Sequence, residues 1–489
     1  MIVKAFAFLG IAVALASAAI TINPSRPVLF GTHRVIPRNL GSNAESNNTA
    51  LWNTVNLRQV YTNPQNRNSF SMRYVTNNRH YRRGGPIFLF VGGPWPLEAH
   101  LVEQGHFVDM AAEMNGFLVA NELRYYGESI PVEDVSRNNF RYLHNVQILS
   151  ELATFIAHLK EDVVRDPNAK VILAGVGYSA SLAQWMRQRF PHLIHGVWSS
   201  SGMVRASTNY REFAEVVGEN IRRFGGDDCY STIWRAFRTA ENLIDAGLST
   251  TVDELFHTCR PIDAANALEV EAFFYGIFNE ISREVVDADL RGNIKQMCEP
   301  LTASDDENSL LELASWLTGR FPNAECLAMD FQSIVDTYNT IDVDSEIVKS
   351  GERQWMFQRC TELGWPLTAA SQYQPFGRRF STDLFHGICE QLFDDWLTRD
   401  RFEALIRQTN DYYGGARPDI RNSISTQGTL DPWSFAGVRE VIFNNTYVTI
   451  IRDAFHGQDM ASISEEDSIE LRRSKEMVRD TIRRWVETR

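Results

Sequence analysis

Cysteines are few and are missing from most of the chain. The six are Cys229, Cys259, Cys298, Cys326, Cys360 and Cys389, so none lies before residue 229 or after residue 389. No two of them have Cys-x-x-Cys spacing and no histidine stands at ligand spacing beside them, which argues against a zinc site. An even number of cysteines in an oxidising compartment predicts three disulfides within this one segment.

Long apolar runs are also missing once the first residues are passed. No later stretch approaches the roughly 20 apolar residues that a membrane-spanning helix needs. The chain begins with one cation, Lys4, an apolar run over 5–16, and the small residues Ala16-Ser17-Ala18. This order predicts a secretory signal peptide over residues 1–18 and a protein that is secreted or lysosomal. In that setting the Asn-x-Thr sequons at Asn47 and Asn444 are expected glycosylation sites.

Basic residues are fewer than acidic ones. The chain has 48 Lys and Arg against 61 Asp and Glu, a formal net charge of −13. A scattered acidic balance argues against nucleic acid or an anionic membrane as a partner. No sequence pattern indicates a metal or an organic cofactor, and none is expected. The length remaining after residue 18 is too great for one compact core, so two lobes or a large insertion are expected.

The hydrophobic pattern changes twice along the chain. Short apolar strands at 86–91, 116–120, 171–175 and 196–199 are separated by amphipathic helices, which predicts a parallel sheet covered on both faces. From about 205 to 400 helical spacing dominates, for example over 210–224, 231–246 and 309–320. Strands at 422–426 and 447–451 follow, and a final helix from about Ser464 places Leu471, Val478, Ile482 and Trp485 on one face.

These changes predict an α/β domain interrupted by a helical cap. We assign residues 19–204 to the first part of the α/β domain, 205–400 to the cap that carries the cysteines, and 401–489 to the second part. Such an arrangement of sheet segments around a helical block is one of the standard layered architectures.

The most informative segment is the turn between the strand at 171–175 and the helix that follows it. It reads Gly175-Val176-Gly177-Tyr178-Ser179-Ala180. In α/β-hydrolases a sharp strand–turn–helix with small neighbours holds the nucleophile. Asp431 and His456 then follow the two late strands, each on a loop, giving the chain order nucleophile, acid, base. The fold class expected is therefore an α/β-hydrolase with a disulfide-stapled helical cap between the turn and the acid.

Several motifs resemble one family of serine exopeptidases, which includes prolyl carboxypeptidase, dipeptidyl peptidase II and thymus-specific serine protease. The resemblance runs from about Ser69 to the C-terminus. The stretches that carry it are SFSMRY (69–74), PIFLFVGG (86–93), RYYGES (124–129), 185–201, QRCTELGW (358–365), LDPWS (430–434) and HGQDM (456–460). It implies cleavage beside proline at a peptide terminus, and so peptides, proline-containing ones included, as partners. A homodimer is left open.

The same resemblance implies how the cysteines pair. The family pattern carries over to Cys229 with Cys298, Cys259 with Cys326, and Cys360 with Cys389. Each bridge would close a loop of about 30 to 70 residues, worth a few kcal/mol in the loop-entropy model.

Against the family pattern, Gly177 stands where the catalytic serine should be. Tyr178 fixes the register, and glycine has no side chain with which to form an acyl intermediate. The family's acid and base carry over to Asp431 and His456, and the amides of Tyr178 and Gly93 to the oxyanion hole. The turn after Gly93 reads Pro94-Trp95, and Pro94 has no N–H to donate.

Three further positions depart from the family: Leu123, Val176 and Ala180. Together with Gly177 they predict a secreted homologue that has lost catalytic activity and that can still bind peptides between the sheet and the cap.

Two alternatives stay open at this point. The string from Gly177 to Ser181 also reads Gly-x-Ser-x-small, so a shifted turn would present Ser179 as the nucleophile of an active peptidase. Otherwise Ser179 is expected to be a helix N-cap. The second alternative is a non-catalytic interaction protein whose cleft is packed shut by bulky residues such as Trp95 and Phe455.

Overall fold

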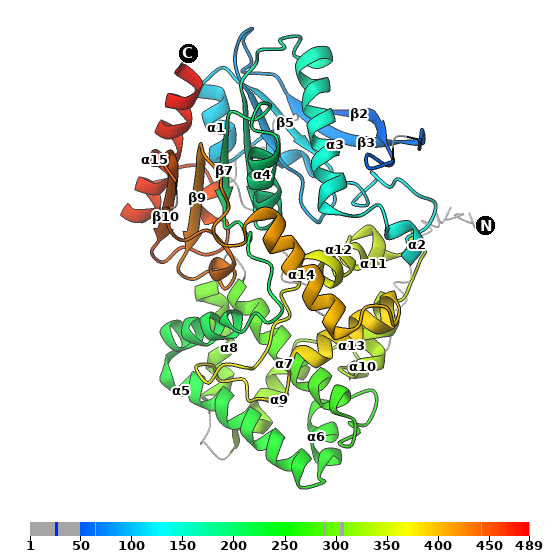
Figure 1. Ribbon diagram of the computed structural model, residues 1–489. Helices are drawn as coiled ribbons and strands as arrows, with labels where there is room; N and C mark the ends of the chain where they lie inside the picture. Colours follow the sequence, from blue (N-terminus) through cyan, green and yellow to red (C-terminus); the bar gives the residue numbers. More distant parts are fainter. Residues whose placement is uncertain are drawn as a thin grey trace, which may run out of the picture.

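The computed structural model (Figure 1) describes residues 25–27, 49–63, 65–286, 290–303, 308–441 and 443–488. The predicted signal peptide and Asn47 lie outside these residues. Asn444 is exposed, as a glycosylated asparagine must be, and its modification stays a prediction. None of the described helices combines the length and the apolar character needed to cross a membrane.

The body of the protein is an eight-stranded sheet with the order β10-β9-β7-β6-β4-β5-β3-β2. Its strands are β2 (Leu51–Arg58), β3 (Ser69–Asn77), β4 (Ile87–Phe90), β5 (Phe117–Asn121), β6 (Val171–Val176), β7 (Gly196–Ser200), β9 (Ser423–Gly428) and β10 (Thr446–Ile451). Every strand expected from the sequence is present, and those strands pair in parallel.

Two strands of the sheet, β2 and β3, were not expected. They pair antiparallel with each other, and β3 pairs antiparallel with β5. β2 is largely exposed, and β3 alternates between exposed and buried residues only over its first half, in contrast to the fully buried β4 to β7. A strand exposed on one face carries no continuous apolar run, so the pattern that revealed the central strands does not reveal these two.

Helices cover both faces of the sheet (Figure 1). On one face lie α1 (His106–Glu113) and α15 (Ile469–Glu487), and on the other α3 (Asn145–His158) and α4 (Tyr178–Arg189). The predicted apolar face of α15 is buried. The helix begins at Ile469 instead of near Ser464, because the side chain of Ser468 accepts a hydrogen bond from the Leu471 N–H at 3.2 Å and caps it.

Between β7 and β9 the chain is mostly helical and forms the lower block of Figure 1. Its helices are α5 (Glu212–Asp245), α6 (Ser249–Phe256), α7 (Ala267–Val286), α8 (Leu290–Leu301), α9 (Ser309–Gly319), α10 (Phe331–Tyr338), α11 (Glu346–Lys349), α12 (Glu352–Gln358), η4 (Arg359–Leu363), α13 (Thr382–Phe393) and α14 (Arg399–Tyr413). The two helical stretches predicted at 210–224 and 231–246 are parts of α5, which kinks at Gly226.

A short strand inside the cap was also not expected. β8 (Cys326–Ala328) pairs in parallel with β1 (Ser25–Pro27). The remaining short elements are η1 (Ala99–Val102), α2 (Arg137–Phe140), η2 (Leu159–Val163), η5 (Ser434–Ala436) and η6 (Gln458–Met460). The domain boundaries stay a prediction, and the one at 400/401 falls within α14.

The three disulfides are the ones the family pattern implied. Cys229 is bonded to Cys298, Cys259 to Cys326, and Cys360 to Cys389, and no cysteine is free. All three lie in the helical block, so covalent constraint is concentrated there and the eight-stranded sheet carries no disulfide.

We expect removal of the shortest bridge to destabilise the cap measurably. The double substitution Cys360→Ala with Cys389→Ala opens a loop with a sequence separation of 29. In the loop-entropy model this costs about 3.6 kcal/mol of unfolding free energy, and removal of the Cys259–Cys326 bridge about 4.4 kcal/mol. Urea unfolding of both variants measures this. An unchanged midpoint in both would contradict the prediction.

Candidate functional site

The turn from β6 into α4 has an unusual backbone conformation at its tip. Gly177 has φ 60° and ψ −125°. Its N–H donates to the carbonyl of Ser200 at 3.1 Å, and its own carbonyl accepts from the Ser181 N–H at 3.2 Å. Residues with a Cβ rarely adopt a positive φ, and those held there at functional sites store strain. Glycine meets the requirement of this turn without that strain.

Small neighbours allow the turn to be tight. A Cβ at Gly175 would stand 2.3 Å from Ser179 Oγ, so only glycine fits at that position. A Cβ at Gly202 would stand 3.2 Å from the Ala180 Cβ and 2.1 Å from Ser199 Oγ. The geometry expected of a nucleophile turn is therefore present around a residue that has no nucleophile.

Asp431 and His456 lie together on the loops that follow β9 and β10. Nδ1 of His456 is 3.0 Å from both carboxylate oxygens of Asp431. Asp431 is fully buried, His456 is 4% exposed, and Asp431 Oδ1 also accepts from the Trp433 N–H at 2.9 Å. A carboxylate so placed holds the imidazole with its other nitrogen turned outward, as in a catalytic triad.

That other nitrogen faces Gly177. A Cβ built on Gly177 would stand 3.1 Å from His456 Nε2, 3.5 Å from Cε1 and 3.9 Å from the terminal methyl of Met203. The structure thus brings together the three positions that the sequence analysis selected. At the point where a serine hydroxyl would meet the imidazole, glycine leaves no side-chain atom. Met203 is a neighbour of the site that the sequence did not indicate.

Ser179 lies in the first turn of α4 and is fully buried. Its Oγ donates to the carbonyl of Val91 at 2.6 Å, at the end of β4. The expected N-cap role is wrong, because Gly177 occupies the N-cap position and Ser179 is inside the helix. The hydroxyl serves instead to tie α4 to the neighbouring strand. That contact disfavours Ser179 as a nucleophile.

Tyr178 is anchored by its side chain. Its hydroxyl donates to Asn145 Oδ1 at 2.5 Å and accepts from Gln358 Nε2 at 2.7 Å, and burial raises the pKa of this phenol. Its backbone N–H is in the first turn of α4, where no preceding helical carbonyl can accept it. This is the amide that the sequence analysis assigned to an oxyanion hole, and that role stays a prediction.

The loop after β4 is filled by an indole ring. A Cβ at Gly93 would stand 2.0 Å from a ring carbon of Trp95, so the ring packs directly on Gly93. Trp95 is 4% exposed and belongs to the apolar cluster that contains Phe90 and Val176. Leu123 is likewise buried in the core. The assignment of the Gly93 amide to an oxyanion hole stays a prediction.

One charged residue was missed by the sequence analysis. Glu362, in the QRCTELGW stretch, accepts hydrogen bonds from the Asn145 N–H at 2.9 and 3.2 Å, and burial raises the pKa of its carboxyl to about 8. The only sign of it in the sequence was an acidic residue placed between Thr361 and Leu363. No group of three potential metal ligands occurs among the described residues.

Comparisons with known proteins place these features in a family. The family "Serine carboxypeptidase S28" matches residues 61–478. Thymus-specific serine protease of Homo sapiens is 27% identical over 440 residues, which cover 87% of this chain and 84% of that protein. Lysosomal Pro-X carboxypeptidase of Homo sapiens is 25% identical over 449 residues, which cover 84% of this chain and 85% of that protein.

Among solved structures, a serine hydrolase from the bacterium Cycloclasticus zankles superposes with a TM-score of 0.37 at 10% identity, covering 89% of this chain and all of that one (100%). The family match spans most of the chain, from before β3 to within α15. The chain belongs to the serine carboxypeptidase S28 family.

Proposed function

We propose that this protein is a secreted or lysosomal member of its family that has lost peptidase activity and binds peptides without cleaving them. The proposal rests on one observation, which is that His456 Nε2 faces a glycine. The nitrogen is 3.1 Å from the position of a Cβ that residue 177 does not have.

The chemistry of the family needs a hydroxyl at this point. In a serine peptidase the imidazole removes the proton of the serine, whose oxygen then attacks the peptide carbonyl. Without that oxygen no acyl intermediate forms, although Asp431 still orients His456. Removal of the nucleophile from a serine protease lowers kcat by about a millionfold.

Peptides as ligands follow from membership of a peptidase family. Proline in those peptides rests on the name of one relative, lysosomal Pro-X carboxypeptidase, and on the sequence motifs. Secretion rests on residues 1–18 alone. A lysosomal destination is supported by the same relative.

The principal alternative is an active exopeptidase that uses Ser179. Its hydroxyl would have to leave the Val91 carbonyl, from which it is 2.6 Å away, and α4 would have to unwind at its first turn. A second alternative is an interaction protein with a closed cleft, for which the packing of Trp95 on Gly93 is the supporting observation.

A covalent probe separates inactivity from the Ser179 alternative. We expect the wild-type protein to remain unlabelled by a fluorophosphonate, because this reagent requires an activated serine. Gel fluorescence after incubation measures it, with an active family member as the positive control. Labelling that disappears in Ser179→Ala would establish the alternative and refute the proposal.

Restoring the serine tests how much of the site survives. In Gly177→Ser we expect turnover of proline-containing peptides to stay at least about a hundredfold below that of an active relative, because loss of one oxyanion donor alone costs 10²–10³ in kcat. The His456 ring must also shift by a few tenths of an ångström to admit the new Cβ. Turnover equal to that of the relative would show an intact site and contradict the wider loss.

The same position gives a stability prediction. Gly177→Ala and Gly177→Ser should each lower the free energy of unfolding by about 1–2 kcal/mol, because both place a Cβ on a residue with φ 60°. Gly319→Ala is the matched control, since Gly319 has no positive φ and its added Cβ meets nothing within 4 Å. Denaturant unfolding of the three variants measures their free energies of unfolding. Equal stability of all three would show that the turn is not strained.

A further inference from the structure

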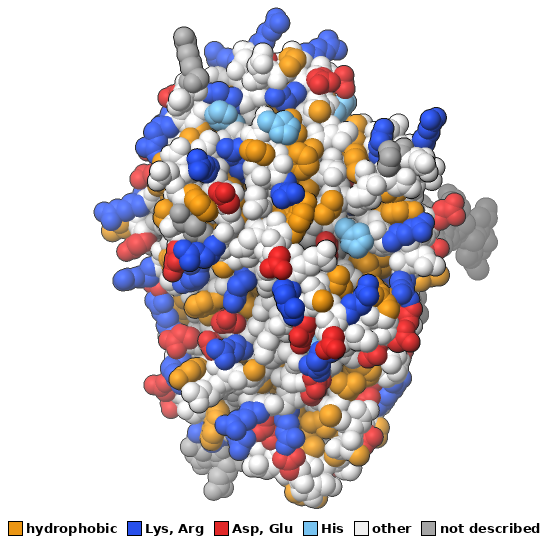
Figure 2. Space-filling model, viewed as in Figure 1, with side chains coloured by type: hydrophobic (Ala, Val, Ile, Leu, Met, Phe, Trp, Pro, Cys, Tyr) orange, Lys and Arg blue, Asp and Glu red, His pale blue; other side chains and the backbone are white. Residues whose placement is uncertain are grey.

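A cavity of about 610 Å³ lies beside the start of α3, between the α/β body and the cap. Its lining includes none of Gly177, Asp431 and His456. The walls come from α2 and the start of α3 on one side and from η4 and α14 on the other. Figure 2 shows the face on which α14 lies in Figure 1, with hydrophobic side chains gathered among charged ones. A cavity of this volume accommodates a small organic molecule.

Glu362 is the one acidic residue in the lining. Its carboxylate accepts only from the backbone N–H of Asn145, and within the described part of the chain it forms no ion pair. Burial raises its pKa to about 8. An ionised carboxylate that is partly withdrawn from water without a cation is costly, so Glu362 favours its protonated form at neutral pH unless a ligand supplies a positive charge.

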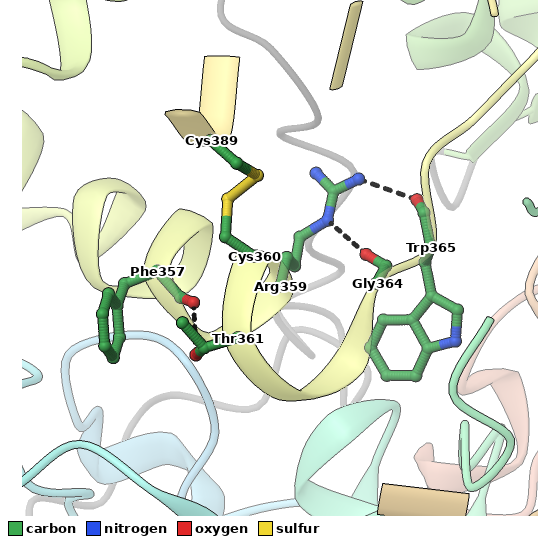
Figure 3. Close-up of a disulfide and its surroundings, with 7 residues drawn as sticks. All are labelled: Phe357, Arg359, Cys360, Thr361, Gly364, Trp365 and Cys389. Carbon is green, nitrogen blue, oxygen red and sulfur yellow. Dashed lines mark hydrogen bonds between the residues drawn. A yellow bond between two sulfur atoms is a disulfide. The ribbon is translucent and has the colours of Figure 1, made fainter. Parts of the chain in front are cut away.

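The segment that carries Glu362 is held rigidly (Figure 3). A disulfide ties Cys360 to Cys389 of α13, and Arg359 donates to the carbonyls of Gly364 at 3.2 Å and Trp365 at 2.7 Å. Gly364 has φ 73°, and a Cβ there would stand 2.0 Å from the Ser207 carbonyl oxygen. Glu362 is therefore fixed before any ligand arrives, which lowers the entropy cost of binding.

Aromatic rings form much of the wall: Phe357, Trp396, Tyr412 and Tyr413. The ring of Tyr413 stacks on Trp185 at a centroid distance of 4.3 Å and is 3% exposed. Its buried hydroxyl has no hydrogen-bond partner among the described residues. Tyr413 and Glu362 both line the cavity, and burial, followed by the charge of Glu362, raises the pKa of the Tyr413 phenol. An unpartnered hydroxyl in a cavity wall indicates a missing ligand atom.

The two arginines of the lining, Arg137 and Arg141, already have other partners. Arg137 is paired with Asp394, and the Arg141 guanidinium lies 4.7 Å from the ring centroid of Tyr142. Neither neutralises Glu362. Glu362 is therefore left without a cationic partner among the described residues, and aromatic rings lie beside it in the lining.

We propose that this cavity binds a small aromatic compound with a primary ammonium group. The ammonium pairs with Glu362 and donates to the Tyr413 hydroxyl, and the ring lies against Phe357 and Trp396. A free aromatic amine and the N-terminal residue of a short peptide offer the same chemistry. The site does not depend on residue 177, so it goes beyond the proposed loss of activity.

Titration calorimetry of the full secreted chain tests the charge requirement. The probes are 2-phenylethylamine, the neutral 2-phenylethanol and the anionic phenylacetate. We expect the amine to bind at least about tenfold more tightly than either of the others, as a charge-assisted hydrogen bond allows. Equal affinities, or tighter binding of phenylacetate, would overturn the proposal.

Two variants test the residues. Glu362→Gln keeps an oxygen to accept from the Asn145 N–H but removes the charge, so the amine should bind about tenfold more weakly while 2-phenylethanol is unaffected. Tyr413→Phe removes the unpartnered hydroxyl, so its unfolding midpoint should not fall although the amine binds more weakly. If Glu362→Gln does not fold, Tyr413→Phe decides. Unchanged amine affinity in the folded variants overturns the proposal.

A comparison of two dipeptides distinguishes the sources of the ligand. Phenylalanyl-glycine and its N-acetyl derivative differ only in the ammonium group. Binding of the free dipeptide and not of the acetylated one assigns the site to peptide N-termini, and binding of 2-phenylethylamine alone assigns it to free amines. If neither amine binds, the proposal fails. Fluorophosphonate labelling reports on residue 177 independently, so the two failures cannot be confused.

Discussion

The positive φ at residue 177 is the constraint on which the rest of the site depends. β6 can pass into α4 within one residue only if that residue adopts φ 60°, and the packing of Gly175 against Ser179 leaves no room to relax it. A serine there would store strain that catalysis requires and folding does not. Glycine keeps the turn, relieves the strain and removes the nucleophile in a single change.

The retained Asp431 and His456 do not argue for retained activity. Asp431 is fully buried, and its oxygens are satisfied by the imidazole and by the Trp433 N–H. Removing either member of such a pair leaves a buried polar group without its partner, which costs several kcal/mol. Stability alone is therefore a sufficient reason for the pair to be present if, as proposed, the chemistry has been lost. The nucleophile has no such structural role, because a glycine fills its place better.

The sequence revealed those parts of the structure that a local pattern or a family motif encodes. Continuous apolar runs located β4 to β7, whereas the largely exposed β2 and the partly alternating β3 contain polar residues that interrupt any such run. The motifs selected Gly177, Asp431 and His456, and the structure brings these three positions together. The contact of Ser179 with Val91 depends on how α4 packs against the loop after β4. The surroundings of Glu362 depend on α3, η4 and α14, which lie far apart in the chain. Neither is visible in a local pattern.

A series of hydrogen bonds connects the cavity with the turn from β6 into α4. Glu362 accepts from the N–H of Asn145, and the side chain of Asn145 accepts from the hydroxyl of Tyr178, the residue next to Gly177. Each contact in this series places a buried polar group that would otherwise lack a partner, so the series is needed for folding whether or not the turn carries a serine. The walls of the cavity are therefore maintained by the same interactions that maintain the turn. If the chemistry has been lost as proposed, the cavity beside α3 is therefore kept all the same.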